Sequence, residues 1–142
     1  MSFLPTGHDM KHGLSEEDRR RYARHLALPS VGEEGQIRLL NSSVLVVGAG
    51  GLGSPAMMYL AAAGVGRIGI MDNDYVEESN LQRQIIHSTS SIGEAKAYSA
   101  AERIGSLNPG IEVTPIVDRL DESNAKSVIE DYDIVIDGTD NF

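Results

Sequence analysis

Cysteine is absent from the 142 residues of this sequence, and acidic residues outnumber basic ones. Without cysteine the chain can form neither a disulfide nor a thiolate zinc site, and it can carry no thioester or persulfide. The 12 basic and 21 acidic residues give a net charge of −9, which disfavours general binding to nucleic acid or to an acidic membrane surface. A local group of basic residues is therefore more informative here than in a basic protein.

A signal peptide and a membrane span are also missing. Residues 1–14 contain Pro5 and two glycines but no apolar core, so we expect a flexible tail there. Residues 44–66 carry no charge over 23 positions, which is long enough to span a bilayer. Six glycines and Pro55 nevertheless divide this run into a strand and a helix. We therefore expect a cytoplasmic protein with one domain over residues 15–142 and no contact with membrane or nucleic acid.

The most informative stretch of the chain is a glycine-rich turn between an apolar run and a helix. Residues 44–47 are apolar and rich in β-branched side chains, as in a strand buried on both faces of a parallel sheet. Gly48, Gly50 and Gly53 then have the G-x-G-x-x-G spacing. Pro55 suits the first turn of a helix, and Gly64 is placed to end that helix after Ala63. The sequence therefore predicts a strand, a tight turn and a helix N-terminus.

Such a turn is a candidate binding site for a nucleotide. Glycines let the backbone approach phosphate closely, and the free N–H groups at a helix N-terminus favour negative charge. The next strand, predicted over residues 67–71, ends at Asp72, 19 residues after Gly53, where a carboxylate usually binds the ribose hydroxyls. The alternatives are a purely structural glycine turn and a loop acid at Asp72 that caps the following turn.

The N-terminal part of the chain predicts two helices. Ser15 and the acidic residues after it have the form of a capping box, so a helix should begin there and end before Pro29. Tyr22, Leu26 and Leu28 are expected to be its apolar contacts, and a solvated surface is the simplest explanation for its arginines. A second short helix is predicted over residues 33–40.

The remaining elements predict an α/β fold. Pro115 marks one of the later strands as an edge strand. Right-handed crossovers then give a Rossmann-like, doubly wound parallel sheet with strand order 3-2-1-4, helices on both faces and the N-terminal helices outside these three αβα layers. The binding cleft should lie between the first and fourth strands. The predicted strands are 44–47, 67–71, 111–117 and 133–137, and the helices between them are 56–63, 94–107 and 121–130.

Basic and acidic residues near this cleft favour chemistry at phosphorus. Lys96 lies in the first turn of a predicted helix, where its charge opposes the helix dipole, so we expect either a negative partner or a solvated side chain. The polar segment 75–91 contains Arg83, and Asp140 follows the fourth strand. A dehydrogenase does not need these cations or this acid, whereas phosphoryl transfer does. His87 is expected to have no catalytic role.

These residues carry a resemblance to a known family. The sequence resembles the nucleotide-binding half of the ThiF/MoeB-like adenylyltransferases, relatives of ubiquitin-activating enzymes, from about Ser15 to Phe142. The resemblance implies a homodimer that binds ATP and Mg²⁺ and adenylylates the C-terminal Gly-Gly carboxylate of a ubiquitin-like sulfur carrier. The motifs that carry it are Arg21-Tyr-Ala-Arg24-His, Gly48-Ala-Gly-Gly-Leu-Gly53, Asp72-Asn-Asp74, Ser79-Asn-Leu-Gln-Arg-Gln84, Lys96 and Thr139-Asp-Asn141.

The same resemblance assigns roles to individual residues. Arg24 is implied to act across the dimer interface on the ATP of the partner. Asp140 is implied to bind Mg²⁺, with Asn141 beside it. The residues implied to bind the nucleotide are Gly48, Gly50, Gly51, Gly53, Asp72, Asp74, Ser79, Asn80, Arg83, Lys96, Asp140 and Asn141, and those implied to act in catalysis are Arg24, Arg83, Lys96 and Asp140.

The sequence also departs from the family pattern. The second half of these enzymes, with its carrier-docking surface, zinc-binding cysteines and, in many members, a reactive cysteine, has no counterpart here. We therefore expect a C-terminally truncated domain whose activity alone is uncertain. The alternatives are the cofactor domain of an NAD-dependent oxidoreductase and a non-catalytic module that binds nucleotide or dimerises.

Overall fold

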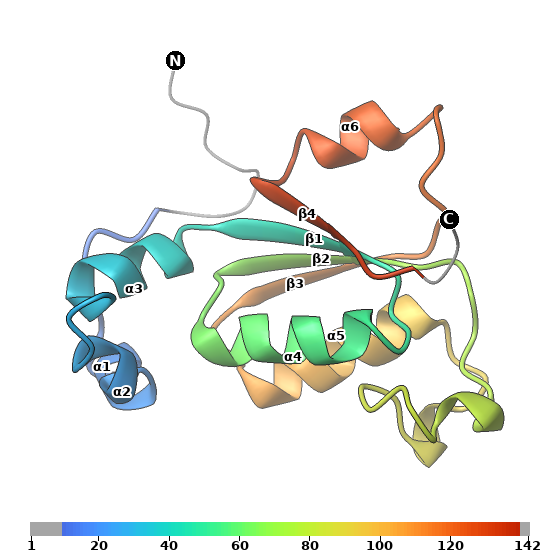
Figure 1. Ribbon diagram of the computed structural model, residues 1–142, viewed down its shortest axis with the longest axis horizontal. Coiled ribbons are helices and arrows are strands. Elements are labelled where there is room, and N and C mark those ends of the chain that lie inside the picture. Colours follow the sequence, from blue (N-terminus) through green and yellow to red (C-terminus); the bar gives the residue numbers. More distant parts are fainter. Residues whose placement is uncertain (1–9, 140–142) are drawn as a thin grey trace.

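Four parallel strands form the centre of the molecule in the computed structural model, which describes residues 10–139 (Figure 1). The order β3-β2-β1-β4 confirms the predicted doubly wound sheet. Leu45 of β1 lies in register with Gly69 of β2 and Val135 of β4. All four carboxyl ends therefore meet at one edge of the sheet. The strands are β1 (Ser43–Val47), β2 (Arg67–Met71), β3 (Glu112–Ile116) and β4 (Ile134–Asp137).

The glycine turn joins β1 to helix α4 (Gly53–Ala63), as predicted. β1 is almost completely buried because its apolar, β-branched side chains are covered on both faces. Pro55 lies in the first turn of α4, where its missing N–H breaks no helical hydrogen bond. Gly64 ends the helix with a left-handed φ of 91°. The short crossover leads directly into β2.

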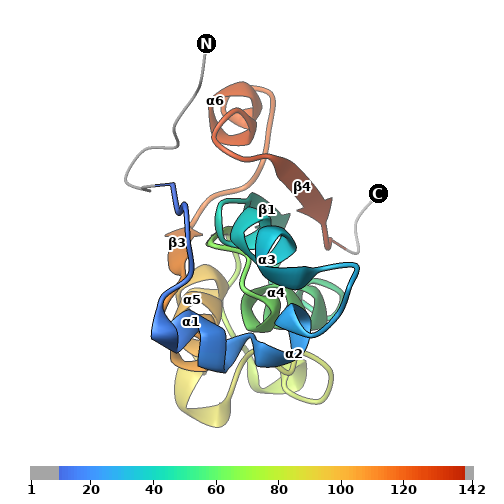
Figure 2. The ribbon, with the colours of Figure 1, turned by 90° about the vertical axis from the view of Figure 1, so that its left-hand side faces the viewer.

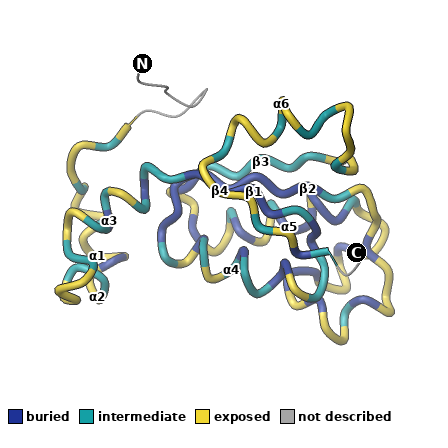
Figure 3. The backbone as a smooth tube through the Cα atoms, turned by 45° about the horizontal axis from the view of Figure 1, so that its top comes forward, coloured by how far each residue is buried: buried dark blue, intermediate teal, exposed yellow. Residues whose placement is uncertain are grey.

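Two helices cover one face of the sheet, and a short one lies over the other (Figures 1 and 2). Helices α4 and α5 (Lys96–Leu107) pack on the face that holds the main core, whose completely buried side chains include Val46, Met57 and Ile104. Helix α6 (Ala125–Ile129) covers the opposite face. This second layer is thin, and β4 is largely exposed next to the buried strands β1 and β2 (Figure 3).

A cation–aromatic contact joins the first residue of β2 to the segment between α6 and β4. The guanidinium of Arg67 lies 4.4 Å from the ring centroid of Tyr132. A side chain at Gly69 would overlap the ring and hydroxyl of Tyr132, so the glycine makes room for this contact. The sequence analysis did not foresee this pairing, because it joins residues far apart in the chain.

The predicted N-terminal helix is split into α1 (Glu16–Arg21) and α2 (Ala23–Leu26), and α3 (Gly32–Leu40) follows. The capping box is confirmed, because Ser15 Oγ accepts the Asp18 N–H at 3.0 Å and the Asp18 carboxylate accepts the Ser15 N–H. The break falls at Tyr22, which is buried and accepts a hydrogen bond from Asn108 at 2.8 Å. The prediction for Leu28 is wrong, because its side chain is 49% exposed.

Two other helices begin later than predicted because local polar contacts precede them. Helix α5 begins at Lys96 because Ala95 forms an antiparallel bridge with Tyr75. Helix α6 begins at Ala125 because the Asp121 carboxylate accepts hydrogen bonds from Ser123 and Asn124 in a preceding turn. The predicted edge position of Pro115 is confirmed, since β3 ends the sheet.

The segment predicted as a tail is partly anchored. Lys11 exchanges two backbone hydrogen bonds with the side chain of Asn41, at 2.7 and 2.9 Å, and its ammonium lies 3.1 Å from Asp18. No helix between residues 10 and 139 is both long enough and apolar enough to cross a membrane.

Candidate functional site

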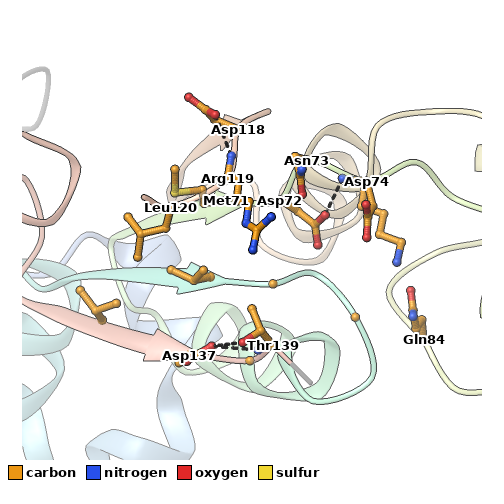
Figure 4. A pocket seen from close by; sticks show the side chains of 16 residues that line it. Met71, Asp72, Asn73, Asp74, Gln84, Asp118, Arg119, Leu120, Asp137 and Thr139 are labelled. Atoms are coloured by element: carbon orange, nitrogen blue, oxygen red, sulfur yellow. Dashed lines mark hydrogen bonds between the residues drawn. The ribbon is translucent and has the colours of Figure 1, made fainter. Parts of the chain in front are cut away.

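A cavity of about 760 Å³ lies at the carboxyl edge of the sheet (Figure 4). Its volume lies within the range of small-molecule sites. The ends of β1, β2 and β4 and the loop after β3 contribute to its wall, as expected for the switch point of a doubly wound sheet. Its polar and glycine lining residues are Gly48, Gly50, Asp72, Asn73, Asp74, Gln84, Lys96, Asp118, Arg119, Asp137, Gly138 and Thr139.

The glycine turn passes so close to the end of β4 that side chains are excluded from it. Gly48 has a φ of +99°, and a Cβ there would lie 3.0 Å from the backbone of both Gly138 and Thr139. A Cβ on Gly53 would overlap the carbonyl oxygen of Gly48. Gly53 therefore serves the packing of α4 on β1, and it is not part of the cavity wall.

This turn leaves a row of backbone donors unused. Within residues 10–139, no acceptor is found for the N–H groups of Gly50, Gly51, Leu52 or Gly53, which lead into the N-terminus of α4. The turn itself is held by other bonds, including Ser54 Oγ to the carbonyl of Gly50 at 2.5 Å. Free N–H groups and the helix dipole together make this end of α4 suitable for an anion.

Asp72 connects the end of β2 to the glycine turn. One carboxylate oxygen accepts the N–H of Ala49 and the other accepts the N–H of Asp74, both at 2.8 Å. The bond from Asp74 shows that Asp72 does cap the following turn, the role given above as the alternative. A carboxylate can accept about four hydrogen bonds, so both oxygens can still accept a hydroxyl. Asp72 and Asp74 also line the cavity, so the structure is compatible with the ribose contact proposed for Asp72.

His87 ties the glycine turn to α5. Its buried ring has Nε2 at 2.8 Å from the carbonyl oxygen of Ala49 and Nδ1 at 2.7 Å from the hydroxyl of Ser99. Because a carbonyl only accepts, Nε2 carries the proton and Nδ1 accepts from Ser99. Burial lowers the pKa of His87, and Lys96 lowers it further, against the opposing effects of Ala49 and Asp72. Both ring nitrogens are thus used within the fold, as expected for a structural histidine.

Lys96 is the first residue of α5 and lines the cavity with only 8% of its surface exposed. Its backbone N–H donates to the carbonyl of Asp74 at 2.9 Å. No carboxylate in the described part of the chain lies within ion-pairing distance of its ammonium. A mostly buried lysine without a protein counterion is costly, so a bound anion would stabilise it.

The polar segment beside the turn holds three of the predicted residues outside the cavity wall. The side-chain oxygen of Asn80 accepts the N–H of Glu77 and so caps the short 3₁₀ helix η1 (Glu78–Asn80). Arg83 is exposed and donates to the carbonyl of Ser79 at 3.1 Å. A Cβ built on Gly51 would lie 4.0 Å from Cγ of Arg83, so this arginine lies beside the free N–H groups of the turn.

The sequence analysis missed the contribution of the loop after β3. Asp118, Arg119 and Leu120 line the cavity, and the guanidinium of Arg119 points into it from the side opposite the glycine turn (Figure 4). The strand order itself was the missed signal, because an edge strand parallel to β2 must end at the same edge of the sheet. Asp137, also missed, accepts from the backbone and hydroxyl of Thr139, and these bonds lower its pKa.

Arg24 lies far from the cavity of its own chain. It belongs to α2, at the opposite end of the molecule from the carboxyl edge of the sheet (Figure 1). There it is exposed and lines a small hollow with Arg20, Arg21 and Ala62. Ala62 lies near the C-terminal end of α4. The structure therefore does not bring Arg24 together with the other predicted residues within one chain.

The predicted metal ligand Asp140 and its neighbour Asn141 lie outside the described residues. Among residues 10–139, no three His, Asp or Glu side chains are grouped so that they could hold a metal ion. Mg²⁺ on a nucleotide usually needs only one or two carboxylates, because phosphates and water supply the other ligands.

Comparison with known proteins shows the family to which the chain belongs. The model of the ThiF family matches residues 22–142. The chain is 52% identical over 139 residues to the probable adenylyltransferase/sulfurtransferase MoeZ of Mycobacterium tuberculosis, and 49% identical over 128 residues to the sulfur carrier protein adenylyltransferase of Thermus thermophilus. These matches cover 98% and 90% of the chain but only 36% and 47% of the relatives.

Among solved structures, the chain is similar to the Escherichia coli tRNA N6-threonylcarbamoyladenosine dehydratase TcdA in complex with ATP. The TM-score is 0.82 at 36% identity, over 89% of this chain and 52% of that one. The shared fold is therefore one that binds ATP in a solved relative.

Proposed function

This chain belongs to the ThiF family, and from that premise we propose that it forms the ATP-binding part of an adenylyltransferase for a sulfur-carrier protein. The observation that carries the proposal is the meeting of the free N–H groups of the glycine turn, Asp72 and Lys96 at one cavity. The names of the relatives indicate the reaction and the class of protein substrate. The proposed domain is residues 15–142, and any step that needs a cysteine must use residues outside these 142.

The order of the strands suggests how ATP lies in the cavity. The phosphates would bind at the N-terminus of α4, where the free N–H groups, Lys96 and the neighbouring Arg83 supply positive charge. The ribose would bind Asp72 at the end of β2. The base would then lie beyond β2, at the end of β3, where Arg119 offers a planar cation and Leu120 an apolar contact.

The proposed reaction joins the C-terminal carboxylate of the carrier to the α-phosphate of ATP. An oxygen of the carboxylate attacks phosphorus, the bond to the bridging oxygen breaks, and pyrophosphate leaves with the electron pair. Negative charge develops on the phosphoryl oxygens and on pyrophosphate, so the cations Lys96 and Arg83 and the backbone donors would stabilise the transition state. Asp140, with Asn141 beside it, is proposed to hold a Mg²⁺ ion, which supplies further charge neutralisation when bound.

We propose in addition that two copies associate and that Arg24 acts on the ATP of the partner. Three features support this arrangement. Arg24 belongs to α2, which lies at the opposite end of the molecule from the carboxyl edge of the sheet (Figure 1). It lies beside Ala62, near the C-terminal end of α4, whereas the phosphate site is at the N-terminal end. Large apolar side chains are exposed along α4, namely Leu52, which precedes its first residue and is 61% exposed, and Tyr59, which is 78% exposed. Antiparallel packing of two α4 helices would cover this stripe and bring each Arg24 to the glycine turn of the other copy.

The oxidoreductase alternative leaves part of the site without a role. A nicotinamide cofactor would use the glycine turn and Asp72 but gives no reason for Arg83 or for a nearly buried Lys96 that has no counterion among residues 10–139. Calorimetry with ATP–Mg²⁺ and with NAD separates the two functions. Tighter binding of NAD would refute the adenylyltransferase.

The decisive test of the activity is pyrophosphate exchange, measured on the full-length polypeptide that contains these residues. We expect ³²P to pass from pyrophosphate into ATP only when a ubiquitin-like sulfur carrier ending in Gly-Gly is present. Exchange that is absent with every such carrier, or independent of the carrier, would refute the proposed function. For the role of Arg24, heterodimers of an Arg24→Ala subunit and an Asp140→Ala subunit should recover part of the activity that each homodimer lacks, because one of the two sites is then intact.

A further inference from the structure

The side chain of Gln84 has an unsatisfied polar atom at the wall of the cavity. Only 4% of the residue is exposed, and its Oε1 is buried without a hydrogen-bond partner among residues 10–139. A buried acceptor without a partner destabilises the fold, because it has lost its hydrogen bonds to water and gained none. The side chain nevertheless lines the cavity, and Figure 4 shows it on the side of Asp74. Such an atom at a binding site indicates a partner that arrives with a ligand.

The fold fixes this amide close to the glycine turn. The backbone N–H of Gln84 donates to the carbonyl of Asn80 at 2.9 Å, and its carbonyl accepts the N–H of His87 at 3.1 Å. Its Nε2 lies 3.5 Å from the place that a Cβ on Gly50 would occupy. His87 is itself bonded to Ala49 in the same turn. The backbone of Gln84 is therefore fixed by its neighbours, and the side-chain amide lies beside the proposed phosphate site.

Phosphate groups alone cannot satisfy this side chain. The amide NH₂ of glutamine donates two hydrogen bonds, and its oxygen accepts. Phosphate oxygens only accept, so they can bond Nε2 but not Oε1, whichever way the amide is turned. The missing partner must be a donor that comes close to the phosphates. In the proposed reaction, the second substrate carries such donors on the peptide N–H groups of its tail.

We propose that Gln84 bridges the two substrates, with Nε2 donating to a phosphate oxygen of ATP and Oε1 accepting the N–H of the last glycine in the carrier tail. The inference rests on the proposed function and deepens it. The last peptide N–H is close to the attacking carboxylate in the chain of the carrier, so holding it fixes the direction of the attack. Gln84 is thus a positioning residue, and it selects for a tail whose last residue has an N–H.

The test combines a protein variant with a modified carrier. Gln84→Met removes both amide functions with little change in shape, and a semisynthetic carrier ending in N-methylglycine removes the last N–H. We expect each change alone to lower kcat/KM for the carrier about 3- to 10-fold, the range of one neutral hydrogen bond. Because both changes remove the same bond, the methylated carrier should cause no further loss with the Gln84→Met enzyme. Two independent losses that multiply would overturn the proposal.

Two controls define the comparison. Gln82→Met changes an exposed glutamine two residues away. It should leave the ratio of kcat/KM for the native carrier to kcat/KM for the methylated carrier as it is in the wild type. A carrier methylated on the second-last glycine should not show the coupling with Gln84→Met. The KM for ATP should rise less in Gln84→Met than the KM for the carrier, since the free N–H groups and Lys96 still bind the phosphates.

The stability of the unbound protein gives a readout that does not depend on activity. Replacing an unsatisfied amide by an apolar side chain should leave the melting temperature of Gln84→Met equal to or above that of the wild type. A lower melting temperature would show that the amide is bonded within the fold, and it would overturn the inference. The methylated carrier tests the wild-type enzyme without any variant. If the wild type shows no exchange with the native carrier, the proposed function fails. If it shows equal exchange with both carriers, only the role of Gln84 fails.

Discussion

Replacing Asp72 by alanine should weaken both the fold and the binding of ATP. Its carboxylate accepts the N–H groups of Ala49 and Asp74, each at 2.8 Å, and it lines the cavity. The first of these bonds joins the end of β2 to the glycine turn. The variant therefore loses a link between the two parts of the proposed nucleotide site, in addition to any ribose contact.

The structure sets the size of each effect. Hydrogen bonds to a charged group contribute about 1.5–3 kcal/mol each. Since Asp72 is partly exposed and solvent screens its charge, we expect a total loss of roughly 2–3 kcal/mol from the two backbone bonds. For a chain of this length that corresponds to a fall in Tm of about 6–12 °C. Loss of the ribose contacts should weaken ATP binding by a further 1.5–3 kcal/mol, or about 10- to 150-fold.

The two effects can be measured separately. Thermal unfolding without nucleotide reports the backbone bonds, and calorimetry with ATP–Mg²⁺ well below the lowered Tm reports the ribose contact. Glu78→Ala is the matched control, because it removes the same charge from an exposed side chain nearby that makes no hydrogen bond within the described residues. Asp72→Asn keeps one acceptor oxygen and should lose less stability than the alanine variant.

Either measurement can refute the reasoning. If Asp72→Ala melts at the same temperature as Glu78→Ala, the two bonds do not hold the turn. If the folded variant binds ATP as tightly as the wild type, Asp72 is only a turn acid, and the proposed position of the ribose is wrong.

Three other predictions concern the fold. His87→Gln should flatten the dependence of stability on pH below about 6.5. Burial lowers the pKa of His87 in the folded protein, so below pH 6.5 the unfolded wild-type chain takes up a proton that the folded chain does not. The wild type therefore loses stability as the pH falls from 6.5 towards that lowered pKa, and the variant should not. A chemical denaturation series at several pH values checks this, and parallel curves would contradict it. Gly53→Ala should prevent stable folding, because its Cβ would overlap the carbonyl of Gly48. Gly105→Ala has open space in α5 and should raise stability by about 0.5–1 kcal/mol. Circular dichroism melts of the two variants check this, and equal effects would refute it. Tyr22→Phe should cost about 1 kcal/mol in urea unfolding because it removes one of the two acceptors of the buried Asn108 amide, and an unchanged midpoint would show that this bond does not hold the N-terminal helices.

The sequence determined the sheet and one side of the site because both depend on local patterns. The apolar run of β1, the glycine spacing and Asp72 at the end of β2 lie within about 30 residues of one another, as expected for one βαβ unit. Gly64 and the capping box of Ser15 mark helix ends through backbone geometry that each residue imposes on its own turn. The strand order followed from the handedness of the crossovers.

Only the tertiary structure decided which distant side chains share a contact. The break at Tyr22 arises from its bond to Asn108, 86 positions away, and the Arg67–Tyr132 contact has no local pattern. Arg119 and Gln84 entered the site because separate segments end at one edge of the sheet, and Arg24 was placed at the opposite end. Short-range sequence patterns fix backbone geometry, but long-range side-chain contacts depend on how the completed elements pack, and in this protein those contacts complete the wall of the cavity.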